Sequence, residues 1–464
     1  KELFDYYFDN EVDREIFKRA ARKCYFPSNQ IILDTIDKHK HSHKQVKFSF
    51  SVSGVFLEQC EMFDKDLIES FRQLATSGCV EFLNQTYYHS ISSLYPEKEE
   101  FISQAKLHKQ TVKDLLGYTP SIFENTELLY NNTIAKTVES MGYRGIYTEG
   151  VEKILGEKSS NFIYTPKGAK KIRVLLRNYK LTDDVGFRFS ARWWPEWPLT
   201  ADKYAGCLAT TKGECINIFP DYETFGEHHW PETGIHSFLQ HLPDEILKFD
   251  HLQMVTPSEV VDKHTSAGEI DVPESEGTVS WADIQRDQSG WLGNVMQWAY
   301  YTTLRRLEPL IKEAEDEEFL RLWRDFQISD HLYYMFLQEA DLEAERHLRA
   351  GDEIPFLQLQ RRLDPVRDDR LHPERRRADR GRPAGGEDLH PPRTGRRVGR
   401  EREVEGREAA PIGPALDRPP DAPVRRTEPG RPACPVELAQ CPAADGVDHR
   451  DQPVPPAGDE EILE

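Results

Sequence analysis

Hydrophobic and polar positions alternate strictly from Val46 to Gly54, and this period of two predicts a strand with one small polar face. Further short apolar runs predict strands at residues 79–83, 122–123, 144–147, 171–176, 186–189, 215–219 and 252–255. Stretches with helical periodicity separate several of them, at residues 56–76, 101–116 and 134–141. The chain therefore alternates between predicted strands and predicted helices.

Such alternation favours parallel strands joined by right-handed helical crossovers, as in a barrel or a doubly wound sheet. Polar, chemically useful side chains follow several different strands, which favours an α/β barrel. After Ser280 the pattern becomes helical only, at residues 291–312 and 317–336. We therefore expect an α/β domain followed by an α-helical one.

Two carboxylates stand just after predicted strands, Asp221 after residues 215–219 and Glu127 after residues 122–123. In a parallel barrel, side chains at these positions face the loops that bind substrate. Such a pair suits glycosidic bond cleavage, in which one carboxylate stays ionised and the other keeps its proton. Plainer interpretations stay open: a helix N-cap or loop acid for Asp221, an acidic first helical turn for Glu127, and Glu124 as a rival to Glu127.

Composition and charge narrow the function classes. The formal net charge of −20 argues against a nucleic-acid partner. No apolar run approaches the roughly 18 residues needed to span a bilayer, so no membrane partner is expected. The seven cysteines are scattered without metal-ligand spacing, which indicates reduced thiols and a cytoplasmic location. Oligomeric state cannot be read from the sequence.

Four segments together resemble signature regions of glycoside hydrolase family 57, in particular of its α-amylase-type members. They are residues 78–83 with 87–90, 123–130, 221–230, and 280–287 with 289–294. The resemblance covers roughly residues 1–340 and implies an incomplete (β/α)7 TIM-like barrel followed by an α-helical domain. It also implies retaining hydrolysis of α-glucans or maltooligosaccharides in carbohydrate metabolism, with no metal or organic cofactor.

Carried over by position, the resemblance implies that Glu127 is the nucleophile and Asp221 the general acid/base. It further implies that a set of acidic and aromatic residues, with one histidine, binds substrate or braces the site: Glu81, His89, Glu223, Trp230, Trp281, Asp283, Asp287 and Trp291.

The resemblance divides the chain into a catalytic barrel at residues 1–270, a helical domain at 271–356 and a tail at 357–464. The tail has no Phe, Tyr, Trp or Lys and is expected to be disordered. We interpret the sequence after about Phe336 as coding sequence read in the wrong frame, which the nucleotide sequence can test. The family's first signature, His-Gln-Pro, is absent because the chain begins after it, so the first barrel strand is expected to be missing.

Other functions remain open at this stage. A 4-α-glucanotransferase would use the same fold and the same intermediate, resolved by a sugar hydroxyl in place of water. A metal-dependent polysaccharide deacetylase or mannosidase would use a related barrel and different chemistry. A catalytically inactive glycan-binding protein is the alternative from another class.

Overall fold

The computed structural model describes residues 4–282 and 285–336. Within this range the chain forms two compact units. The larger unit comprises residues 14–282, 285–288 and 327–329, and the smaller unit comprises residues 4–13, 289–326 and 330–336. The predicted tail at 357–464 lies outside the described residues.

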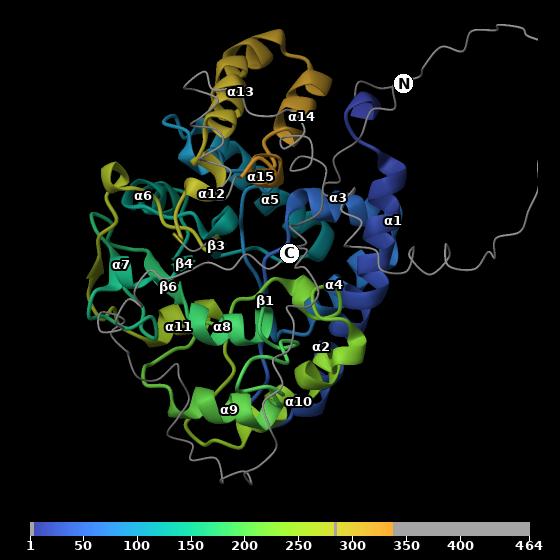
Figure 1. Ribbon diagram of the computed structural model, residues 1–464, viewed down its shortest axis with the longest axis vertical. Coiled ribbons are helices and arrows are strands. Elements are labelled where there is room, and N and C mark those ends of the chain that lie inside the picture. The colour runs from blue at the N-terminus through green and yellow to red at the C-terminus, as the bar shows by residue number, and fades with distance from the viewer. Residues whose placement is uncertain (1–3, 283–284, 337–464) are drawn as a thin grey trace, which may run out of the picture. The chain divides into compact units, whose positions relative to one another are not determined.

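Parallel strands form the centre of the larger unit (Figure 1). Strand β1 (Phe48–Phe50) pairs with β2 (Val80–Phe82), β3 (Ile122–Glu124) with β4 (Gly145–Glu149), β4 also with β6 (Arg173–Arg177), and β5 (Thr165–Pro166) with β7 (Glu269–Ile270). Single parallel bridges join Asn84 to Phe123 and Arg177 to Asn217. The parallel order thus continues from β1 through β6 to the segment that precedes Asp221, which confirms the predicted α/β class.

Helices connect these strands. In the larger unit they are α2 (Phe26–His39), α3 (Gly54–Phe63), α4 (Lys65–Thr76), α5 (Glu99–Leu116), α6 (Asn132–Ser140), α7 (Glu152–Leu155), α8 (Tyr179–Gly186), α9 (Ala201–Thr210), α10 (Ile235–Leu247) and α11 (Pro257–Lys263). A π-helix, η2 (Ala21–Tyr25), joins α1 (Asn10–Ala20) to α2. Short 3-10 turns are η1 (Phe4–Tyr6), η3 (Ser92–Leu94), η4 (Thr126–Leu128), η5 (Tyr222–Thr224), η6 (Pro231–Thr233) and η7 (Glu274–Glu276).

The smaller unit is helical in its described part. It contains α12 (Ser289–Leu292), α13 (Val295–Ala314), α14 (Glu317–Asp325) and most of α15 (Ser329–Tyr333). The predicted single helix at 291–312 is divided because Asn294 forms a capping box with Gln297 and starts a new helix there.

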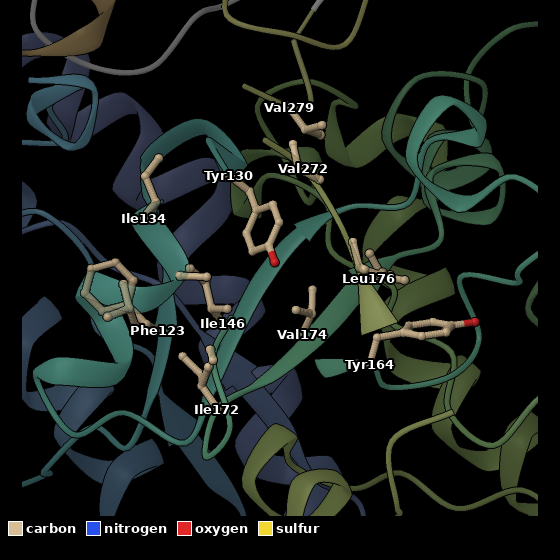
Figure 2. Close-up of a cluster of buried hydrophobic side chains, with 14 of the residues drawn as sticks. Phe123, Tyr130, Ile134, Ile146, Tyr164, Ile172, Val174, Leu176, Val272 and Val279 are labelled. Carbon is tan, nitrogen blue, oxygen red and sulfur yellow. The ribbon is translucent and has the colours of Figure 1, made fainter. Parts of the chain in front are cut away.

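The sheet of β3, β4 and β6 is buried on both faces, as parallel sheets usually are. Figure 2 shows one face, where Phe123, Ile146, Val174 and Leu176 pack with Ile134 and other apolar side chains. The neighbours of these residues along each strand point to the opposite face and join a second cluster: Ile122, Tyr147 and Leu175. Because side chains on both faces of these strands are packed, the positions of the ends of β3, β4 and β6 are fixed.

Some predicted elements are wrong. Residues 186–189 are not a strand, because Asn178 caps α8 through a hydrogen bond from Leu181 N and the helix continues to Gly186. Residues 252–255 form no strand, and 215–219 take part only through the bridge at Asn217. The predicted helix at 56–76 is two helices, because Asp64 adopts an extended conformation and caps α4.

None of the helices among the described residues is long and apolar enough to cross a membrane.

Candidate active site

Glu127 lies directly after β3, in the 3-10 turn η4, on backbone in the left-handed region. Its φ is 60° and that of the next residue, Leu128, is 52°. Bulky residues adopt this region rarely and at a cost, so other groups must hold it in place. The carbonyl oxygen of Glu127 accepts hydrogen bonds from Ser280 Oγ at 3.0 Å and from Trp281 N at 3.3 Å. Of the predicted alternative, an acidic first helical turn, the structure shows only the short 3-10 turn η4, since the α-helix α6 begins at Asn132.

The Glu127 carboxyl group is buried, with 6% of the residue exposed, and both of its oxygens accept hydrogen bonds. Trp281 Nε1 donates to Oε2 at 2.6 Å and Ser329 Oγ donates to Oε1 at 2.9 Å. Burial raises the pKa of Glu127 and outweighs these two donors, which lower it, so that the pKa is about 7. The group can therefore exchange its proton near neutral pH.

His89 and Ser329 form a hydrogen-bonded pair beside Glu127. His89 Nδ1 lies 3.0 Å from Ser329 Oγ and 3.9 Å from Glu127 Oε1. Their backbones are joined as well, since Ser329 N donates to the carbonyl oxygen of His89 at 2.9 Å. Like Glu127, His89 is in the left-handed region, with a φ of 47°. The pair therefore fixes one oxygen of the carboxyl group and brings a titratable ring close to it.

Asp221 precedes the 3-10 turn η5, and its side chain makes no capping hydrogen bond there. Burial is the main cause that raises its pKa, and Glu223 raises it further. Positive charge opposes this rise, first from His228 and then from Arg177 and His89. A carboxyl group held towards its protonated form is suited to donate a proton.

The two candidate carboxyl groups are electrostatically linked. The negative charge of Asp221 contributes to the raised pKa of Glu127, so the two groups are near enough to interact although 94 positions separate them in the sequence. Asp221 also raises the pKa of Glu124, which places a third carboxyl group in the same neighbourhood.

Glu124 is the last residue of β3 and its carboxyl group is buried. Ser51 Oγ donates to Oε2 at 2.8 Å and Gln85 Nε2 donates to Ser51 Oγ at 2.8 Å. Burial raises the pKa of Glu124 to about 8, with a smaller contribution from Glu127. At neutral pH this group is therefore mainly protonated, which makes it a poorer nucleophile than Glu127.

Two other predicted site residues, Glu81 and Glu223, form hydrogen bonds with neighbouring groups. Glu81 is buried in β2 and accepts a hydrogen bond from Ser258 N at the start of α11, at 2.9 Å. Glu223 accepts a hydrogen bond from the Tyr25 hydroxyl group. Glu81 and Glu223 therefore brace the backbone or a neighbouring helix through these bonds.

Trp230 is 60% exposed, and Lys23 Nζ lies 4.6 Å from the centre of its ring. Asp287 forms an ion pair with Lys153 at 3.3 Å. Trp291 belongs to the smaller unit, where it is buried near Tyr333. Asp283 lies outside the described residues.

Three contributors to the site were missed from sequence. Ser329, Ser51 and Arg177 are ordinary in their local sequence, and no spacing pattern marks them. Ser329 reaches Glu127 from 202 positions away, a proximity that only the fold reveals. Arg177 could have been suspected as a charged residue at the end of an apolar strand.

Comparison with known proteins decides the family. The model of glycosyl hydrolase family 57 matches residues 1–273. The chain belongs to this family. A relative from Methanocaldococcus jannaschii named "Putative alpha-amylase" is 46% identical over 345 residues, which cover 72% of this chain and 72% of the relative.

More distant relatives agree with this assignment. An alpha-amylase of Pyrococcus horikoshii is 25% identical over 268 residues, and the match covers 56% of this chain but only 39% of that protein. The crystal structure of a branching enzyme of the same family, from Thermococcus kodakaraensis, has a TM-score of 0.55 at 15% identity and covers 76% of this chain and 90% of its own. That likeness shows the fold of a family 57 enzyme.

Proposed function

We propose that this glycoside hydrolase cleaves α-glucosidic bonds of α-glucans with retention, with Glu127 as nucleophile and Asp221 as general acid/base. The names of the amylase relatives support the substrate class. The observation that carries the residue roles is the Glu127 carboxyl group, buried on left-handed backbone, held through both oxygens and electrostatically coupled to Asp221.

The mechanism follows from the two protonation states. Protonated Asp221 gives its proton to the glycosidic oxygen while ionised Glu127 attacks the anomeric carbon, so that the carbon–oxygen bond to the leaving sugar breaks and a glycosyl-enzyme forms. Water then attacks the same carbon, Asp221 takes a proton from this water molecule, and the Glu127 carboxylate leaves. Each Glu127 oxygen accepts one hydrogen bond from the protein and keeps a second lone pair for this chemistry.

The fixed position of the Glu127 carboxyl group also supports its role as the nucleophile. Trp281 and Ser329 stabilise the ionised carboxylate, and they hold it in one orientation before substrate arrives. Retention requires the two carboxyl groups about 5 to 5.5 Å apart, so a fixed position matters for both steps.

We extend the proposal to the architecture. The parallel order from β1 to the segment before Asp221 supports an incomplete (β/α)7 TIM-like barrel at residues 1–270. For the helical domain proposed at 271–356, the support comes from the helices of the smaller unit, which begin at Ser289. A cytoplasmic location remains part of the proposal, and the free thiols of the described cysteines are compatible with it.

The test is hydrolysis of maltooligosaccharides by the wild type, Glu127→Gln and Asp221→Asn, with product anomers followed by NMR. We expect an α-anomeric first product and a fall in kcat by at least about 1,000-fold in each variant. Glu139→Gln is the matched control, because this carboxyl group binds the backbone at Lys170 and Lys171 in a different part of the unit. Full activity in Glu127→Gln would refute the assignment, and products longer than the substrate would indicate glucanotransfer.

A further inference from the structure

A largely buried cluster of four charged side chains contacts the candidate site through Arg177. Glu149 Oε2 at the end of β4 accepts hydrogen bonds from Arg177 at 2.8 Å and from Arg286 at 2.7 Å. Asp183 in α8 accepts from the same two arginines, from Arg177 at 2.7 Å and from Arg286 at 3.0 Å. Glu149 is 0% and Arg177 3% exposed, so the arrangement forms a closed ring of ion pairs inside the protein.

Arg177 connects this ring to both proposed catalytic carboxyl groups. Its Nε donates to the carbonyl oxygen of Phe219 at 2.8 Å, two residues before Asp221. Its guanidinium group lies 5.5 Å from the ring centre of Trp281, whose indole nitrogen donates to Glu127. One side chain therefore supports the backbone that carries Asp221 and the ring that holds Glu127.

Arg286 anchors the other end of the Trp281 segment. Its carbonyl oxygen accepts a hydrogen bond from Ser280 N at 3.2 Å, next to Trp281 in the sequence. Its own backbone is left-handed, with a φ of 47°, and its guanidinium group lies 4.1 Å from the ring centre of Tyr179. The ion pairs therefore stabilise an unusual conformation from which Trp281 reaches Glu127.

We infer that Arg177 is a positioning residue that sets the separation of the Glu127 and Asp221 carboxyl groups, with Arg286 fixing the Trp281 segment against it. This inference rests on the proposed function. Burying four charges is not an efficient route to stability, since apolar residues often replace such clusters without loss. A fixed geometry is what the cluster provides here, and a misplacement of about 1 Å at a reacting centre can lower the rate roughly 100-fold.

The experiment measures kcat and KM on maltooligosaccharides for Arg177→Lys, Arg286→Gln, Trp281→Phe and the double variant Arg177→Lys/Trp281→Phe. Lysine keeps the charge but cannot contact Phe219, Glu149 and Asp183 at once. We expect kcat of Arg177→Lys to fall about 100-fold with KM changed less than about threefold, because ground-state binding does not depend on the carboxyl separation. Arg286→Gln should show the same pattern more weakly.

The double variant separates positioning from a general loss of structure. The part of the Arg177 effect that runs through Trp281 is counted only once in the double variant, so the combined loss should be smaller than the product of the two single losses. Arg72→Gln is the matched control: Arg72 also donates through Nε to a carbonyl oxygen, that of Leu115 at 3.0 Å, and pairs with a carboxylate, Glu69, on the surface of α4. Its kcat should stay at the wild-type value.

An unchanged kcat in Arg177→Lys, or losses that multiply in the double variant, would overturn the inference. Should Arg177→Lys fail to fold, Arg286→Gln decides the matter, because the Arg286 side chain is 20% exposed and its loss disturbs the interior less. The proposed function fails separately, when Glu127→Gln stays active. Inactive Glu127→Gln beside fully active Arg177→Lys and Arg286→Gln would refute the positioning role alone.

Discussion

Replacing Glu127 by glutamine should stabilise the protein at alkaline pH while it abolishes activity. In the folded protein the pKa of Glu127 is raised from 4.5 to about 7, with burial as the main cause. The folded state therefore holds the proton more tightly than the unfolded state. The stability that this group contributes is complete below about pH 4.5 and is lost as the pH rises through about 7.

The magnitude follows from the size of this rise. At about 1.4 kcal/mol per pKa unit, ionising Glu127 in the folded protein costs about 3 kcal/mol. Glutamine does not titrate, and Ser329 can turn its hydroxyl group to accept from the new amide while Trp281 still donates to the remaining oxygen. The variant should match the wild type near pH 4.5 and exceed it by about 2 to 3 kcal/mol at pH 8.

Urea unfolding followed by far-UV circular dichroism at pH 5 and pH 8 measures this difference through the transition midpoint at constant m. Glu139→Gln serves as the control of opposite sign. Backbone N–H groups from Lys171, Lys170 and Ile172 lower the pKa of Glu139, so this variant should lose stability at pH 8 and lose less as the pH falls. A Glu127→Gln variant that gains no more at pH 8 than at pH 5 would refute the reasoning.

Three further outcomes are expected. Trp281→Phe removes a donor that lowers the pKa of Glu127, so the acid limb of the kcat/KM profile should move up by about one pH unit or more; an unmoved limb would contradict the hydrogen bond's role. Glu124→Gln should keep kcat within about tenfold in the same assay, because Glu124 is mainly protonated at neutral pH; a loss as deep as that of Glu127→Gln would make it the better nucleophile. Gly226→Ala should lower the unfolding free energy by about 2 kcal/mol or more, because the new Cβ would lie 2.0 Å from a carbonyl oxygen of η2 at a φ of 135°. Gly156→Ala, also at positive φ but with open space around it, is the control that should lose about 1 kcal/mol in the same denaturation series.

Local patterns in the sequence predicted much of the framework. The alternation at 46–54 contains β1, and the apolar runs at 79–83, 144–147 and 171–176 overlap β2, β4 and β6, because a buried parallel strand needs consecutive apolar residues. The prediction at 186–189 was wrong because α8 ends at Gly186 and a turn follows, in which Phe189 packs into an apolar cluster as a strand residue would. Family membership, and with it the glycosidase class, is confirmed by the family match.

The site was predicted less completely, for a physical reason. Glu127 follows β3, and Asp221 follows the segment that bridges to β6 at Asn217; side chains at such positions of a parallel fold are expected to face the substrate. Their roles stay predictions until the variants are measured. Ser329 and Arg177 act through contacts that join distant parts of the chain, and no local pattern encodes such a contact.

The late position of Ser329 has a consequence for how the enzyme matures during synthesis. Both candidate carboxyl groups leave the ribosome long before residues 327–329, which then insert beside residues of the early chain: Ile328 bridges to Ser90 and Gln327 accepts a hydrogen bond from Gln104 at 3.0 Å. Until that moment Glu127 lacks one of its donors and His89 lacks the serine that orients it. A nascent chain that is halted before residues 327–329 should therefore be inactive on glucan even when its sheet has already formed. Activity should appear only when these three residues are in place.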